Sequence, residues 1–169
     1  VEPKIIELNE NRVDLVFEVD EGPLIKIETI VFSGNKNFSD AALTQAIVSR
    51  ERRWWAFLTP NDKYDEGRLD YDVRLLRQFY LSRGYADINV SRARGGLLPD
   101  RSGFALTFLI NEGVRYKVND IKISSQIENI DLEALRDLMK FDDDQWYDVR
   151  QLEQGLLDVS NQLGVYGYA

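Results

Sequence analysis

The tripeptide Gly84-Tyr85-Ala86 returns at the end of the chain as Gly167-Tyr168-Ala169, and the pair Glu21-Gly22 returns as Glu112-Gly113. Alternating apolar residues precede each Glu-Gly pair, as Val13, Leu15, Phe17 and Val19 in one run and Phe104, Leu106, Phe108 and Ile110 in the other. This period of two predicts half-buried strands. The chain therefore repeats one structural unit.

Each Gly-Tyr-Ala triplet follows an apolar pattern of helical period. The positions are Leu69, Val73, Leu76 and Tyr80 in the first copy, and Leu152, Leu156, Val159 and Leu163 in the second. The spacing predicts two amphipathic helices, each with one apolar stripe. We interpret the triplet as structural: glycine ends the helix, tyrosine packs where the chain turns, and alanine starts the next strand. Tandem units of this kind form arrays of stacked neighbours.

Composition excludes several functional classes. The chain has 169 residues, of which 44% are hydrophobic and 30% charged, which is an ordinary globular mixture. The net charge is −8 and no basic stripe is present, which argues against a nucleic-acid partner. Histidine and cysteine are absent, so most catalytic triads and zinc sites are excluded. We predict no enzyme, no cofactor and no metal site; the run Asp142-Asp143-Asp144 lacks the alternating ligands of a calcium loop.

The complete unit is expected to run β-α-α-β-β over 25–113. Its predicted elements are a strand at 25–33, a helix at 40–49 capped by Ser39, a helix at 66–83 capped by Asp65 and ended by Gly84, and strands at 86–94 and 103–111. A hairpin at 3–8 and 12–20 precedes it. The second copy is predicted to contain a strand at 116–123 and helices at 131–140 and 149–163, capped by Asp131 and Asp148.

We expect the chain to be cut from a longer polypeptide, because it starts within a strand pattern and its second copy lacks two closing strands. The orphan hairpin is expected to lie against the complete unit. The incomplete unit is expected to be disordered, completed by further chain, or completed by a hairpin from another molecule.

Three motifs of the complete unit resemble a POTRA (polypeptide-transport-associated) domain: Val31-Phe32-Ser33-Gly34-Asn35, Arg83-Gly84-Tyr85-Ala86 and Glu112-Gly113. The surrounding sequence resembles the POTRA domains of the outer-membrane β-barrel assembly factors of Gram-negative bacteria. The resemblance implies an α+β fold of tandem units, each a three-stranded mixed sheet covered on one face by two antiparallel helices. It divides the chain into the closing hairpin of a second POTRA unit (1–22), a complete third unit (23–113) and the start of a fourth (114–169).

The same resemblance implies a scaffold on the periplasmic face of the outer membrane. Its implied partners are unfolded outer-membrane proteins, bound by strand addition, and accessory lipoproteins of the assembly complex. Membrane contact would be made only by a barrel domain outside this chain. The alternatives are a POTRA module of a two-partner secretion transporter or a division protein, with purely architectural docking, and an enzyme built on carboxylate pairs.

The first candidate site is the polar strand at 87–94, composed of Asp87, Ile88, Asn89, Val90, Ser91, Arg92, Ala93 and Arg94. Charged residues commonly protect an exposed sheet edge, and an open edge can also accept an extended peptide whatever its side chains are. Both readings, a client-binding edge and an ordinary solvated edge, stand at this point.

The second candidate is an aromatic loop with Arg53, Trp54, Trp55 and Phe57. Two adjacent indoles do not both enter one core easily, and indoles often anchor interfaces. The loop is therefore a candidate partner contact. The alternative is a hydrophobic cover over one end of the helical layer.

Overall fold

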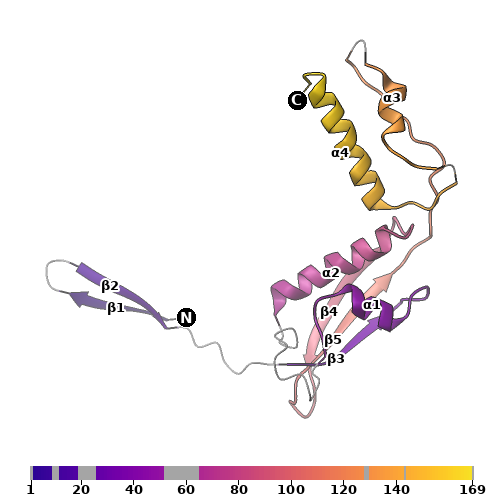
Figure 1. Cartoon of the computed structure of the whole chain (residues 1–169). Coiled ribbons are helices and arrows are strands. Elements are labelled where there is room, and N and C mark those ends of the chain that lie inside the picture. The colour runs from indigo at the N-terminus through magenta and orange to yellow at the C-terminus, as the bar shows by residue number, and fades with distance from the viewer. Residues whose placement is uncertain are drawn as a thin grey trace.

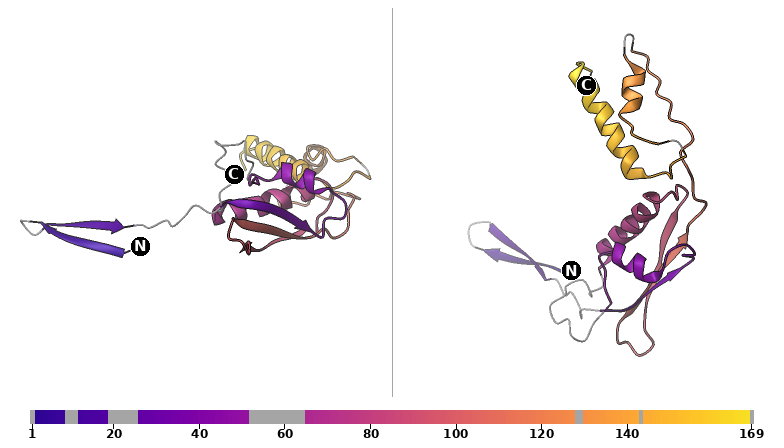
Figure 2. Two further views of the ribbon diagram at one scale, coloured as in Figure 1. Left: turned by 90° about the horizontal axis from the view of Figure 1, so that it is seen from below. Right: turned by 45° about the vertical axis from the view of Figure 1, so that its right-hand side comes forward.

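The computed structural model describes residues 2–8, 12–18, 26–51, 65–127, 130–142 and 144–168. The first two strands, β1 (Glu2–Leu8) and β2 (Arg12–Glu18), pair antiparallel in a two-stranded sheet of their own. The predicted hairpin is thus confirmed. Its predicted docking is wrong, because the hairpin shares no ladder with the second sheet and lies away from it in Figure 1 and in the left view of Figure 2.

A three-stranded mixed sheet forms the centre of the complete unit. It contains β3 (Ile27–Ser33), β4 (Asn89–Leu97) and β5 (Phe104–Asn111) in the order β3-β5-β4. The pair β3 and β5 runs parallel, whereas β4 and β5 run antiparallel. Strand β4 begins later than the predicted residue 86 and continues to Leu97, where a loop was predicted. A bulge between Ala93 and Gly96 lets the strand pass its glycines.

Two helices, α1 (Asp40–Ala46) and α2 (Glu66–Leu81), cover one face of this sheet (Figure 1). The predicted caps are confirmed, since the side chain of Ser39 accepts from the N–H of Ala42 and that of Asp65 accepts from the N–H of Arg68. Gly84 follows α2 with φ +100°, a left-handed conformation that favours glycine. The predicted α+β class and layer arrangement are confirmed.

The core lies between the helices and the sheet. The apolar stripe predicted on α2 faces it, with Leu69, Leu76 and Tyr80 at most 2% exposed. Edge-to-face aromatic contacts of 5.0–5.7 Å between ring centroids join Phe38, Phe79, Tyr80 and Tyr85. Such pairs add to the roughly 1.5–3 kcal/mol that burial of each large side chain contributes. This cluster fixes the end of α2 and the turn that leads into β4.

The second unit contains α3 (Leu132–Asp137) and α4 (Val149–Val165), capped as predicted by Asp131 and Asp148. The strand predicted at 116–123 is wrong: only a single bridge, Lys117 to Trp146, forms there. A strand needs a neighbour for its backbone groups, and no described strand lies beside this segment.

The helix α4 is present, but its predicted stripe is not covered. Leu156 is 55% exposed, because the side that would face a sheet meets none among the described residues. Instead the helix packs through Gly155, where an added Cβ would lie 3.0 Å from Met139 Cα. Within the described ranges, no helix has the length and apolar character needed to cross a membrane.

Candidate functional site: an exposed sheet edge and the joint behind it

The strand β4 forms one edge of the three-stranded sheet, as the sequence predicted. Asn89 and Ser91 are exposed, whereas Val90 packs against the core and Ile88, just before the strand, is 4% exposed. The inward residues hold the strand in place while its outward residues are small and polar. β4 therefore pairs with β5 along one side, and its other backbone edge pairs with no described strand.

The eight predicted edge residues do not share one role. Arg92, Ala93 and Arg94 contribute backbone to β4, but Asp87 and Ile88 precede it. The Asp87 carboxylate accepts a hydrogen bond of 2.5 Å from the Tyr116 hydroxyl, which raises the pKa of that phenol. Asp87 is thus a structural contact and lies outside the edge that a guest strand could use.

Glu112, at the end of β5, ties three parts of the complete unit together. Its carboxylate accepts from the backbone N–H groups of Lys36 and Asn37, from the Asn37 amide, and from the Tyr80 hydroxyl at 2.9 Å. Burial, followed by this hydrogen bond, raises the pKa of Tyr80. The neighbouring turn needs Gly34, since a Cβ there would lie 2.0 Å from the carbonyl oxygen of Ile110. Glu112 is the glutamate of the repeated Glu-Gly pair, and in the complete unit it holds the turn after β3 and the helix α2 to the end of β5.

A hydrogen-bonded joint links the two units. It consists of Arg83, Gly84 and Asp87 on one side and Arg115 and Tyr116 on the other. The N–H of Tyr116 donates to the carbonyl of Gly84 at 2.7 Å, and Arg115 Nε donates to the carbonyl of Arg83 at 2.8 Å. A Cβ on Gly84 would lie 2.8 Å from Arg115 Cγ. Gly84 therefore ends α2 and also makes room for the next unit.

Trp146 supports the joint from the second unit. The Arg115 guanidinium lies 3.9 Å from the centre of its indole ring, and the Lys117 ammonium lies 5.1 Å away. Lys117 also pairs with Asp144 at 2.5 Å. The N–H of Tyr147 donates to the carbonyl of Tyr116 at 3.0 Å. The segment after β5 is thereby held on both sides.

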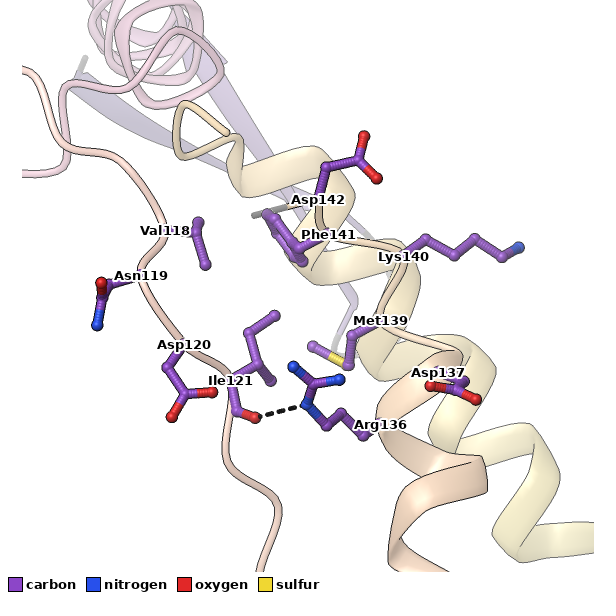
Figure 3. A pocket seen from close by; sticks show the side chains of 10 residues that line it. All are labelled: Val118, Asn119, Asp120, Ile121, Arg136, Asp137, Met139, Lys140, Phe141 and Asp142. Carbon is purple, nitrogen blue, oxygen red and sulfur yellow. Dashed lines mark hydrogen bonds between the residues drawn. The ribbon is translucent and has the colours of Figure 1, made fainter. Parts of the chain in front are cut away.

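A pocket of about 110 Å³ lies in the second unit, between the segment after the joint and the end of α3 (Figure 3). Ile121, Met139 and Arg136 line it, and Arg136 Nε donates to the carbonyl of Ile121 at 3.2 Å. Three acidic and two basic side chains also line it: Asp120, Asp137 and Asp142 with Arg136 and Lys140. Because no three acidic side chains of the described residues are grouped to hold a metal ion, the lining favours a packing contact.

Sequence reasoning placed some functional candidates outside the described residues and missed others inside them. Arg53, Trp54, Trp55 and Phe57 lie outside the described residues, so their predicted partner contact stays a prediction. The role of Glu112 was missed although its pair is repeated, because its partners lie 32 to 76 residues away in the sequence. Nothing in the local sequence around Tyr116 indicates its contact with Asp87.

Comparisons with known proteins agree with the predicted resemblance. The POTRA family model, described as a surface antigen variable number repeat, matches residues 25–113. The outer membrane protein assembly factor BamA of Neisseria meningitidis serogroup B is 27% identical over 169 residues, which is 100% of this chain and 21% of that protein. BamA of Neorickettsia risticii is 28% identical over 95% of this chain and 22% of its own length. This chain therefore spans about a fifth of the length of these curated relatives.

The fold has a counterpart among solved structures. The crystal structure of Haemophilus influenzae BamA POTRA3-5 superposes with a TM-score of 0.71 at 20% identity, covering 86% of this chain and 57% of that one. At this identity the likeness concerns the fold.

Proposed function

Because this chain belongs to the POTRA family, we propose that it is a periplasmic scaffold module of the outer-membrane protein assembly machinery. It binds extended segments of unfolded outer-membrane proteins along β4 and docks partner proteins, including accessory lipoproteins. Alignment with BamA relatives over 95–100% of this chain supports this role over that of a secretion transporter module. The place of action is the periplasmic face of the outer membrane.

We propose three segments for the chain: a hairpin of a preceding unit at 1–22, a complete unit at 23–113, and the start of a following unit at 114–169, which contributes α3 and α4. The family match over 25–113 supports the middle segment. The likeness to a structure that contains POTRA units 3 to 5 supports the order. In this division the joint around Gly84 and Tyr116 connects two successive units.

The position of β4 at the sheet edge carries the proposal. An extended guest pairing with 89–94 through alternate residues would make about six backbone hydrogen bonds, each worth a net ~0.5–1.5 kcal/mol. Ordering a disordered guest costs about 2–5 kcal/mol. At most about 7 kcal/mol remains, so the dissociation constant is no tighter than roughly 10 μM. Weak, sequence-tolerant binding suits a factor that passes many clients onward.

The test is an NMR titration of the chain with a peptide from the last strand of an outer-membrane β-barrel protein. Two further peptides carry N-methyl groups on alternate residues, one on each side of the strand. We expect shift changes in 89–94 with the parent peptide and with one of the two methylated peptides. Strand addition requires this asymmetry, because only one side of a guest pairs with the sheet.

Equal binding of both methylated peptides would show that side chains, not backbone, hold the guest. No shift in 89–94 at millimolar peptide would remove the client-binding part of the proposal. The architectural role, docking of partner proteins, would then be what remains.

A further inference from the structure

The sheet has a second edge, at β3, and a side chain covers its centre. The backbone N–H of Ile30 donates to Glu51 Oε1 at 2.8 Å. The Thr29 hydroxyl lies 3.4 Å from the same oxygen. Ile30 is in the middle of β3, and its side chain is buried in the core, so only its backbone faces Glu51. The Glu51 carboxylate is thus the hydrogen-bond acceptor for a backbone N–H group of β3.

This donor is one that a guest strand would need. Backbone groups of a strand point alternately to its two sides, so beyond the irregularity between Ile27 and Thr29 the N–H groups of Ile30 and Phe32 share the side away from β5. Glu51 takes the first of these two. Among the described residues, no side chain forms a comparable hydrogen bond to the backbone of 89–91 on the opposite edge. The two edges of the sheet are therefore unlike.

Glu51 is held in place by the segment before it. Asp72 of α2, which is fully buried, accepts from the N–H of Val48 at 2.7 Å and from that of Ser49. Arg50 Nη1 donates to the carbonyl of Ser49 at 2.8 Å. The chain is thus held against α2 up to Ser49, two residues before Glu51. This places the Glu51 carboxylate beside β3.

We infer that Glu51 closes the β3 edge, so that extended polypeptide can add to this sheet only at β4. The inference takes the identity of the guest, an extended segment of an unfolded protein, from the proposed function. A guest at β3 would have to displace a charge-assisted hydrogen bond, which is about twice as strong as a neutral one. Its carbonyl oxygens would also approach the carboxylate, and two acceptors repel. Natural sheets use charged side chains in this way to protect edges.

Amide hydrogen exchange, measured with no peptide present, tests whether Glu51 protects the backbone of the β3 edge. In Glu51→Ala we expect the Ile30 amide to exchange at least about tenfold faster than in the unaltered chain, because its partner is lost. Glu51→Gln keeps an oxygen acceptor and should retain most of the protection. Glu153→Ala removes an exposed carboxylate from α4 and serves as the matched control. Unchanged Ile30 exchange in Glu51→Ala would overturn the inference.

Peptide titration tests the consequence. In Glu51→Ala, the peptide should produce shift changes along 28–32 that are absent from the unaltered chain and from Glu51→Gln. A variant with faster Ile30 exchange but no peptide contact at β3 would also overturn the inference. The proposed function fails separately, if the unaltered chain shows no peptide contact at β4. In that case the exchange comparison still decides whether Glu51 closes its edge.

Discussion

Replacement of Glu112 by alanine removes the acceptor that ties the end of β5 to the turn after β3 and to α2. The donors of Lys36, Asn37 and Tyr80 lose their partner. The Tyr80 side chain is 0% exposed, so its hydroxyl has no water to bind and its loss costs about 1–3 kcal/mol. The three partly buried donors, which are the Lys36 N–H, the Asn37 N–H and the Asn37 side-chain amide, lose roughly 0.5–1 kcal/mol each. We expect the complete unit to lose about 3–6 kcal/mol of its free energy of unfolding.

Urea unfolding followed by NMR signals of Leu76 and Phe108 measures this loss in the complete unit alone. For a domain of this size, 1 kcal/mol corresponds to a shift in melting temperature of about 4–8 °C, so a fall of at least ~12 °C is expected. Glu133→Ala, on the exposed first turn of α3, is the matched control.

The companion variant Tyr80→Phe isolates one of the donors. It should cost about 1 kcal/mol, and the double variant with Glu112→Ala should cost less than the sum, because both remove the same hydrogen bond. A loss below about 1 kcal/mol for Glu112→Ala, equal to that of Glu133→Ala, would refute the idea that the Glu-Gly pair anchors the unit.

Three further substitutions probe separate features. Gly34→Ala forces a Cβ to within 2.0 Å of the Ile110 carbonyl oxygen, and amide spectra should show loss of the native β3 turn at a cost of ~3 kcal/mol or more. Asp72→Ala leaves two backbone donors without an acceptor and should lower the free energy of unfolding by about 2–4 kcal/mol in urea, whereas a change under ~0.5 kcal/mol would contradict the contact. Tyr116→Phe removes the hydrogen bond to Asp87 and should give more independent tumbling of the two units in ¹⁵N relaxation; identical relaxation would count against a role in the joint.

Local rules predicted the elements that depend on local chemistry. The helix starts at Asp65, Asp131 and Asp148 follow from the need of the first N–H groups for an acceptor, and each cap is present. The left-handed Gly84 follows from the end of a periodic pattern. The sheet edge at β4 was predicted correctly because charged and polar residues are common on strands at an exposed sheet edge.

Features that depend on distant partners were not predictable. The alternation over 116–123 reports a half-buried face but not whether a neighbouring strand exists, and without one the segment stays unpaired. Glu51 and Glu112 look like ordinary acidic residues in the sequence. Their roles arise only when the fold brings them to the backbone of Ile30 and Asn37. The end of β4 was missed because a bulge allows its glycines to remain in the ladder.

The joint has a thermodynamic consequence for the array. The carbonyls of Arg83 and Gly84 lie in the turn that follows α2, and they accept from Arg115 and Tyr116 of the next unit. The following unit therefore supplies the hydrogen-bond partners of this turn, and the free energy of one unit depends on whether its neighbour is folded. Such nearest-neighbour coupling makes a row of units melt cooperatively, in the manner of a one-dimensional chain.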